Sequence, residues 1–281
     1  VLVLSSAVAG LATAPYAAAH FNRFTDYGLI ANLLSVPLMG ALVMPAAVAA
    51  AVLAPLGLAA PALWAMGAGL GWILSVAGHV ADLPGAITPV VAPGPAVLPL
   101  LSAGALVVLL WQGRARWFGL APVLVAFALW AGTERPTVLI SSSGGLVGVL
   151  GPEGRALSKP RGDGFSAAVW LENDGDPGTQ EDAAARPGAS GPDGDRRLEV
   201  GGLTLRHVTG RDRAARAAAA CPVADVVVVN TALDPVSGGG CLLIDAARLR
   251  ARGALALSLR DGTVRLRHAG DASAGRLWRA R

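Results

Sequence analysis

The first half of the chain alternates between long apolar stretches and short polar segments. Five stretches are rich in Val, Leu and Ala, namely Val1–Ala14, Val36–Leu58, Ala62–Val80, Ala96–Trp111 and Trp117–Trp130. A helix needs about 20 apolar residues to cross the hydrocarbon core of a bilayer, and Val36–Leu58 meets that length most clearly. The pattern therefore predicts a polytopic α-helical membrane domain of about four to five spans over residues 1–133.

Prolines and glycines refine this prediction. Pro15 is expected to close the first helix, and Pro37, Pro45 and Pro55 are expected to kink or break the second. The glycine-rich run Gly67–Gly71 permits close packing of a neighbouring helix. Residues 83–99 are rich in proline, which predicts a loop.

In the second half, apolar and polar residues alternate over short segments separated by glycines, as in the strands of a soluble domain. We expect strands at Thr137–Ser141, Leu146–Leu150, Arg155–Ser158, Leu198–Val200, Leu203–Val208, Val226–Val229, Cys241–Ile244, Leu255–Leu259 and Val264–Arg267. We expect short helices at Phe165–Leu171, Arg211–Ala220 and Ala246–Arg252. Asn173–Arg197 has few large apolar residues and is predicted to be an exposed or mobile loop. Residues 134–281 are therefore expected to form a small soluble α/β (α+β) domain.

One polar segment interrupts the membrane half. Ala19–Pro37, which we call the polar knot, reads AHFNRFTDYGLIANLLSVP and contains His20, Asn22, Arg23 and Asn32. Polar groups at membrane depth are costly and persist where they face a protein interior, a watery path or the interface. A simple aqueous loop between two spans explains the same pattern, so both interpretations stay open.

The polar knot resembles the signature segment of the ComEC family of bacterial competence proteins. The resemblance lies in a small-residue span ending at Pro15-Tyr16 and in the core Ala31-Asn32-Leu33-Leu34-Ser35-Val36-Pro37. In the second half, Trp170-Leu171-Glu172-Asn173-Asp174-Gly175-Asp176 looks like a sequence of proteobacterial members with a shortened C-terminal domain. The chain opens inside an apolar run, so we expect it to be the C-terminal piece of a longer protein.

The resemblance implies an inner-membrane channel that imports single-stranded DNA during natural transformation. The DNA path would be bordered by His20, Asn22, Arg23, Asn32 and Pro37. The implied partners are single-stranded DNA, the lipid bilayer and a cytoplasmic motor or DNA-receptor protein of the uptake machinery, and a homo-oligomer stays open. Two alternatives are a polytopic transporter of a small or lipid-linked solute, and a membrane-anchored hydrolase using Asp225 and Asp245, which flank two buried strands.

Charge adds a second set of candidate residues. The chain carries a formal net charge of +4, and up to Thr133 its charged side chains are Arg23, Asp26, Asp82, Arg114 and Arg116. The pair Arg114 and Arg116 marks its loop as cytoplasmic by the positive-inside tendency, which would place the soluble domain in the periplasm. Arg114 and Arg116 could also contact phosphates, as could Arg265 and Arg267, which alternate along one strand. An arginine-rich solvated face produced by coding bias explains the same residues.

The sequence lacks the chemistry of the nuclease-like domain that often ends full-length ComEC proteins. That metallo-β-lactamase-like fold needs a His-x-His-x-Asp-His cluster, whereas this chain has four histidines and no His-x-His. The resemblance therefore implies a degenerate domain, and we expect no cofactor, no metal and no enzyme activity. Cys221 and Cys241 are the only cysteines, and a disulfide and two buried thiols both remain open.

Overall fold

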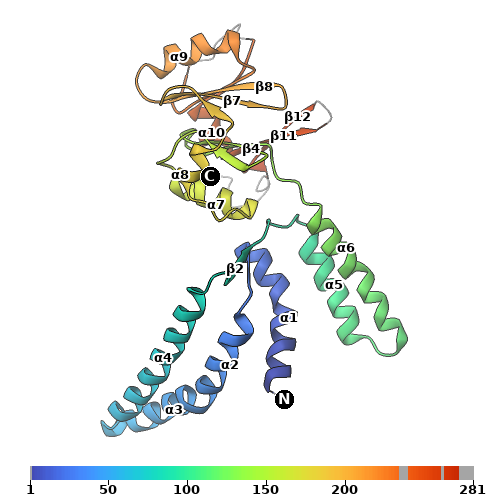
Figure 1. The fold of residues 1–281 in the computed structure, drawn as a ribbon, viewed down its shortest axis with the longest axis vertical. Coiled ribbons are helices and arrows are strands. Elements are labelled where there is room, and N and C mark those ends of the chain that lie inside the picture. Colours follow the sequence, from blue (N-terminus) through green and yellow to red (C-terminus); the bar gives the residue numbers. More distant parts are fainter. Residues whose placement is uncertain (1, 234–239, 261–262, 272–281) are drawn as a thin grey trace. The chain divides into compact units, whose positions relative to one another are not determined.

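The computed structural model describes residues 2–233, 240–260 and 263–271. The chain forms two compact units, Val1–Pro99 and Leu100–Arg281. The first unit contains helices and one small sheet. The second contains a helical hairpin followed by two larger sheets (Figure 1).

The first unit is built from helices α1 to α4 and a two-stranded sheet. The helical elements are α1 (Leu2–Phe21), α2 (Gly28–Leu38), a π-helical turn (Met39–Val43), α3 (Met44–Leu53), a 3₁₀ turn (Ala54–Leu56) and α4 (Ala60–Ala81). The strands are β1 (Arg23–Thr25) and β2 (Ile87–Pro89), which pair antiparallel. The predicted loop over residues 83–99 therefore contains a strand.

Pro55 lies where a helix ends, in the 3₁₀ turn Ala54–Leu56, whereas Pro15, Pro37 and Pro45 lie within helical segments. Helix α1 continues through Pro15 to Phe21, so the expected end at Pro15 is wrong. Residues Gly28–Leu56 form one continuous helical segment, although Pro37 and Pro45 lie inside it. Directly before Pro45 the helix widens by one residue, because the Met44 N–H donates to the carbonyl of Met39. A wider turn makes room for a proline ring that would otherwise meet the preceding carbonyl.

This wide turn packs against α4 at Gly69. A Cβ atom added at Gly69 would lie 2.7 Å from Cγ2 of Val43, whereas Gly67 and Gly71 face open space. The predicted role of the glycine run in helix packing is therefore confirmed for its central residue. A side chain at Gly69 would push the two helices apart.

A second helical hairpin opens the other unit. It consists of α5 (Val97–Leu110), a 3₁₀ turn (Arg114–Gly119) and α6 (Leu120–Ala131). Gly104 and Gly119 let the backbones touch, since a Cβ on either one would lie 2.6 Å from the carbonyl oxygen of the other. Close approach at small residues is the usual way in which membrane helices pack.

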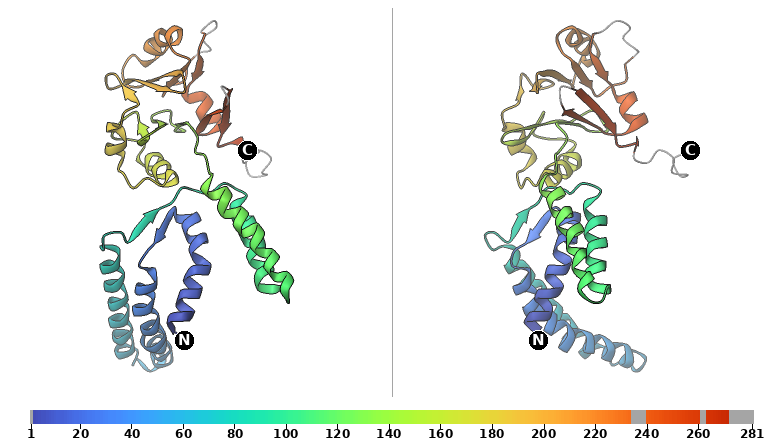
Figure 2. Two further views of the ribbon diagram at one scale, coloured as in Figure 1. Left: turned by 45° about the vertical axis from the view of Figure 1, so that its right-hand side comes forward. Right: turned by 90° about the vertical axis from the view of Figure 1, so that its right-hand side faces the viewer.

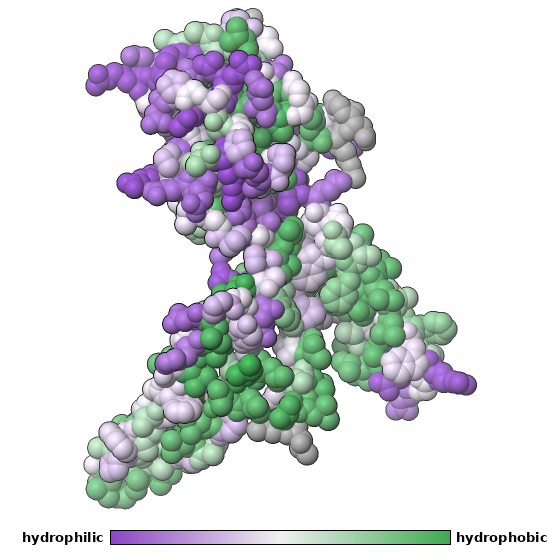
Figure 3. Space-filling view, viewed as in Figure 1, coloured by the Kyte–Doolittle hydropathy of each residue, from purple (hydrophilic) through white to green (hydrophobic). Residues whose placement is uncertain are grey.

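Within the described residues, three helices are long and apolar enough to cross a membrane: Gly28–Leu56, Ala60–Ala81 and Arg114–Ala131. Their outward side chains are mostly apolar, and the surface over the helices is largely hydrophobic, whereas the sheet region is largely hydrophilic (Figure 3). After the predicted division, we call the apolar helices the membrane part and the sheet region with its helices the soluble part.

The soluble part contains two five-stranded sheets. The first has the order β12-β11-β3-β4-β5 and is antiparallel throughout. Its strands are β3 (Val138–Ile140), β4 (Val147–Gly151), β5 (Gly154–Leu157), β11 (Leu255–Arg260) and β12 (Thr263–His268). The second has the order β10-β9-β8-β7-β6, with β9 parallel to both of its neighbours. Its strands are β6 (Ala189–Ser190), β7 (Asp195–Val200), β8 (Leu203–Val208), β9 (Val226–Val229) and β10 (Leu242–Ile244).

The two sheets share one core and carry helices on their outer sides. Inner side chains of both sheets, among them Ile140, Val147, Leu205 and Val228, pack with Leu249 of α10 (Ala246–Arg252). A second apolar cluster joins α9 (Arg213–Ala220) to the second sheet, and a third joins α7 (Gly164–Asp174) and α8 (Gln180–Ala185) to the first. The result is a four-layer sandwich of helix, sheet, sheet and helix (Figure 2).

The loop expected at Asn173–Arg197 is not a loop. The segment contains α8, β6 and the start of β7. Helix α8 begins with a capping box, in which the N–H of Asp182 donates to the Thr179 hydroxyl and the N–H of Thr179 donates to the Asp182 carboxylate. The prediction failed because alanine-rich and charged residues can pack at a sheet surface without large apolar side chains.

Candidate functional site

The polar knot is closed by the small sheet of strands β1 and β2. Arg23 lies opposite Pro89, and Thr25 lies opposite Ile87. Asn22 forms the turn between α1 and β1 with a φ of 52°, a left-handed conformation that asparagine tolerates better than most residues. Its carbonyl accepts from the N–H of Val90. The segment is therefore folded back on residues more than sixty positions away and is more than a simple loop between spans.

Asp26 holds this arrangement together. Its carboxylate Oδ2 accepts a 2.8 Å hydrogen bond from the Thr88 hydroxyl, and its N–H donates to the carbonyl of Ala86. The adjacent Tyr27 hydroxyl donates to the carbonyl of Pro84. Gly28 then starts α2 close to β1, since an added Cβ would lie 2.9 Å from Oγ1 of Thr25.

A groove of about 360 Å³ lies between α1, β1 and the first turns of α2. The α1 side is made of small residues and Leu11, and the polar side chains along the groove are Ser6, Thr13, Thr25, Asp26 and Asn32. A row of hydroxyl, carboxylate and amide groups on otherwise apolar helices marks a polar path or ligand site. This groove is the candidate site of the membrane part.

The structure separates the predicted path residues. Asn32 lines the groove, whereas His20, Asn22, Arg23 and Pro37 are not among its lining residues. Arg23 is exposed, and its Nε donates to the carbonyl of Phe21. The residue that sequence reasoning missed is Asp26. Its signal was available, because Asp26 and Asp82 are the two acidic residues before Glu134.

Pro37 disturbs α2 without opening it. The carbonyl of Leu34, in the turn around this proline, accepts from the indole N–H of Trp72 on α4 at 3.4 Å. Neighbouring helices commonly satisfy carbonyls near prolines in this way. Pro37 and Pro45 therefore do not break this helical segment, although the helix widens directly before Pro45.

Arg116 has a structural role in the α5–α6 hairpin. Its Nε donates to the carbonyl of Val108 at 3.0 Å, and its guanidinium lies 5.6 Å from the ring centroid of Trp117. Arg114, at the start of the same turn, is exposed. Of the two predicted phosphate contacts in this loop, Arg114 is the one whose side chain is accessible.

Arg265 and Arg267 lie as predicted on one face of β12. Arg265 pairs with Ser258 and Arg267 with Ala256 of β11, and both arginines are exposed. Strand β12 is an edge strand of its sheet. Of the further arginines near the C-terminus, Arg276, Arg279 and Arg281 lie outside the described residues.

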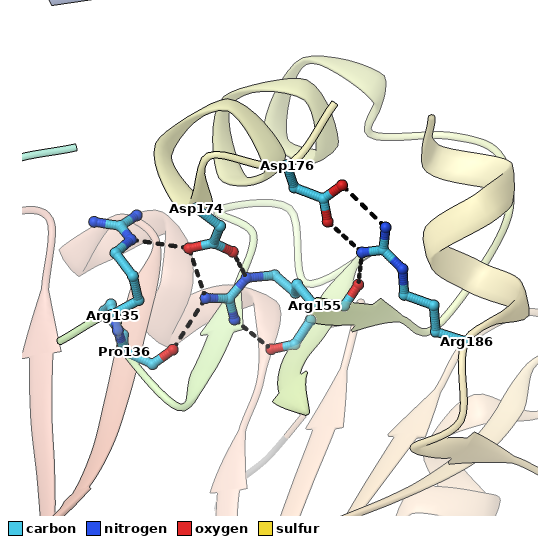
Figure 4. A network of polar contacts seen from close by, with 7 residues as sticks. Arg135, Pro136, Arg155, Asp174, Asp176 and Arg186 are labelled. Atoms are coloured by element: carbon cyan, nitrogen blue, oxygen red, sulfur yellow. Dashed lines mark hydrogen bonds and ion pairs between the residues drawn. The ribbon is translucent and has the colours of Figure 1, made fainter. Parts of the chain in front are cut away.

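The motif Trp170–Asp176 builds a buried ionic network (Figure 4). Arg155 on β5 is completely buried, and its Nε donates to Oδ2 of Asp174 at 2.5 Å. Two further Arg155 nitrogens donate to the carbonyls of Gly148 and Pro136. Arg135 donates to the other oxygen of Asp174 at 2.8 Å. The C-terminal end of α7 is thereby tied to β5 and to the segment that leads from α6 into the first sheet.

Asp176 extends this network to α8. Both carboxylate oxygens accept from the guanidinium of Arg186, which also donates to the carbonyl of Arg155. The hydrogen bonds from Arg186 hold the pKa of Asp176 below its usual range, and the same contact raises the pKa of Arg186. The motif that carries part of the family resemblance therefore has a structural explanation.

Asp225 and Asp245 do not form a catalytic pair. Asp225 precedes β9 and Asp245 follows β10, and these strands run parallel with Leu242 opposite Val226. The two aspartates therefore lie at opposite ends of this parallel strand pair and are not brought together as the hydrolase alternative requires. Asp225 accepts from the N–H of Thr204, and Asp245 caps α10 by accepting from the N–H of Arg248.

Cys221 and Cys241 are joined in a disulfide, with Cα atoms 5.2 Å apart. Cys221 follows α9, and Cys241 precedes β10. The bond links the helix layer to the edge of the second sheet. Both residues belong to the apolar cluster around α9.

The histidines of the soluble part are apart from each other. His207 lies on β8 in the second sheet, and His268 lies on β12 in the first. In the part of the chain that the structure describes, no group of three or more His, Cys, Asp or Glu side chains could hold a metal ion.

His207 is buried against the loop after β3. Its Nε2 lies 3.0 Å from the carbonyl oxygen of Gly144, so Nε2 carries the proton. Burial lowers the pKa of His207 to about 4, and the ring is therefore neutral at pH 7.

The soluble part should lose stability as the pH falls below about 6.5. In the unfolded chain the imidazole of His207 has the ordinary pKa of 6.5 and is protonated below that pH. In the folded chain it is protonated only below about pH 4. Between pH 7 and pH 5 we expect a loss of about 2 kcal/mol in the free energy of unfolding. Urea titrations of the full chain in detergent at both pH values would measure it. His207→Gln should remove this part of the pH dependence, and an unchanged pH dependence in the variant would contradict the assignment.

Residues 1–115 match the model of the family described as Competence protein. This part of the chain is similar to competence proteins. The matched region contains the polar knot, the groove and helices α1 to α5. It supports a role in competence. No curated protein and no solved structure matches the chain.

Proposed function

We propose that this chain forms part of an inner-membrane channel that passes single-stranded DNA into the cytoplasm during natural transformation. One observation carries the proposal: the region similar to competence proteins contains a groove between apolar helices, and Asp26 and Asn32 are among its lining residues. A channel for a polar polymer needs such a lining at membrane depth. Asn32 supplies both amide donors and an acceptor, and Asp26 orders the wall through Thr88.

The topology follows from the charged loop between α5 and α6. Arg114 and Arg116 lie at a hydrophilic hairpin tip (Figure 3), and the positive-inside tendency favours the cytoplasm for it. Helix α6 would then deliver the soluble part to the periplasm. A cytoplasmic motor or DNA-receptor protein would supply the driving force.

We propose further that the soluble part is a degenerate metallo-β-lactamase-like domain with a scaffolding or DNA-contacting role and without enzyme activity. Its two stacked sheets between outer helices support a hydrolase-type ancestry. The exposed arginines Arg265 and Arg267 would contact the phosphate backbone from β12.

Replacing Asn32 in the groove should reduce DNA import. Asn32→Leu is expected to lower the transformation frequency at least about tenfold, the factor that about 1.4 kcal/mol on a barrier gives. Ser35→Leu is the matched control, since Ser35 lies on the same helix and does not line the groove. Labelled DNA should still become resistant to external nuclease but fail to reach the cytoplasm. Normal transformation of the Asn32 variant at normal protein level would contradict the proposal.

A further inference from the structure

A second polar cavity lies in the soluble part, away from the arginines of β12. Its volume is about 240 Å³. Three segments line it: the connection between β5 and α7, the turn before β7 with β7 itself, and β8 with the residue that follows it. The charged and polar lining includes Lys159, Arg161, Asp193, Arg196, His207 and Thr209. We call this cavity the cationic pocket.

Three cations and one carboxylate line the cationic pocket, and the cations keep free donors. The ammonium group of Lys159 pairs with Asp163 at 3.2 Å. Because an ammonium group has three protons, two of them remain for other acceptors. Arg161 pairs through Nε with Glu181, which leaves the rest of its guanidinium for another acceptor. Its side chain is 85% exposed, so a ligand can reach it.

Arg196 is held more rigidly. Its terminal nitrogens donate to the carbonyl of Gly191 and to the carboxylate of Asp193. The side chain of Asp193 is 92% exposed, so water screens its charge and it offsets little of the positive charge of Arg196. Its Nε is enclosed and has no acceptor among the described residues. A buried donor without an acceptor is rare in folded proteins and leaves a fixed positive field at this wall.

The floor of the cationic pocket is a built structure and not a solvated surface. His207 is 2% exposed, and its ring is fixed by the carbonyl of Gly144. Ser158 is equally buried, and its hydroxyl accepts from the N–H of Val147. A rigid floor with cations around the rim suits a compact oxyanion.

An aromatic side chain follows the pocket residues closely in the chain. Phe165 lies four residues after Arg161, near the start of α7, and is 85% exposed. Proteins bind single strands where bases stack on an aromatic ring while cations hold the backbone, and Phe165 lies close to Lys159 and Arg161 along the chain. The arginines of β12 have no such aromatic neighbour in sequence.

We propose that the cationic pocket binds a phosphodiester group of single-stranded DNA through Lys159 and Arg161, with Phe165 stacking on an adjoining base. The ligand chemistry is a phosphate oxyanion, and its assignment to DNA rests on the proposed function. The soluble part then holds the strand at a site of its own, distinct from the groove of the membrane part.

The test uses the full chain in detergent and a fluorescent single-stranded 12-mer, with binding followed by anisotropy at several salt concentrations. Lys159→Gln with Arg161→Gln should weaken binding about tenfold or more and reduce the salt slope by about 2. Arg250→Gln with Arg252→Gln removes the same charge from exposed positions on α10 and should have a smaller effect. Equal losses in the two double variants would overturn the proposal. Unchanged urea midpoints establish that all variants are folded.

Two further arms separate the sources of phosphate. Phe165→Ala should weaken DNA binding about fivefold or more. The protection against urea unfolding that inorganic phosphate gives the chain should stay the same. Loss of phosphate protection without loss of DNA binding in the Lys159 and Arg161 variant would overturn the DNA assignment and leave a free-phosphate site. A third outcome separates the two proposals. If the pocket variants lose DNA binding while cells carrying Asn32→Leu are transformed normally, the channel proposal fails and DNA binding by the cationic pocket is supported.

Discussion

Replacing Asp174 by alanine is expected to lower the free energy of unfolding of the soluble part by about 3–5 kcal/mol. The reason is that Arg155 is completely buried and Asp174 is its only carboxylate partner among the described residues. Without it a guanidinium charge stays in the protein interior uncompensated. The same change removes the acceptor of Arg135 and loosens the segment leading out of α6. Pulse proteolysis of the full chain in detergent across a urea series would measure the loss.

A matched control and a rescue make this prediction specific. Glu199→Ala breaks the pair with Arg197, in which both side chains are more than half exposed, and should cost less than about 1 kcal/mol. The double variant Arg155→Met with Asp174→Leu should recover part of the loss, since replacing a buried pair by apolar residues is often neutral. Equal effects of Asp174→Ala and Glu199→Ala would show that the network does not stabilise this part.

Breaking the disulfide is expected to cost about 3 kcal/mol, because it would free a loop that spans 20 residues in the unfolded chain. Cys221→Ser with Cys241→Ser, or reduction of the wild type, should lower the urea midpoint of the soluble part by the same amount. The two treatments should not be additive. A midpoint insensitive to reductant would contradict the bond.

The disulfide also tests the proposed topology. Disulfides persist in the bacterial periplasm and are rare in the cytosol. Thiol trapping in intact cells should therefore find both cysteines protected from alkylation until a reductant is added. Free thiols in otherwise native protein would argue that the soluble part lies on the cytoplasmic side.

The Arg155 network shows what the resemblance in the second half represents. The residues Trp170, Leu171 and Asp174 resemble a family sequence, and in the structure they pack α7 onto the first sheet and pair with Arg155. None of them lies in the cationic pocket. Their role is to position α7, whose first turn carries Phe165 next to the connection with Lys159 and Arg161.

The sequence by itself determined most of the elements of this protein, although it did not indicate β1, β2, β6 or α8. Apolar stretches long enough to cross a bilayer become helices, because a backbone in lipid must satisfy its own hydrogen bonds. In the soluble part, strands such as Leu203–Val208 and Val226–Val229 lie where the pattern of β-branched and apolar residues predicts them. Asn32 was also found from sequence, since a polar side chain within an apolar segment is conspicuous.

Only the tertiary structure decided which of these elements meet. The pairing of β1 with β2, the burial of Arg155 and the parallel register that separates Asp225 from Asp245 depend on residues far apart in the chain. The same holds for the cationic pocket, where Lys159, Arg196 and His207 come from three segments. Local propensity and period describe a residue's neighbours along the chain. They carry no information about strand order or about the partner of a buried charge, which is set by packing the whole core at once.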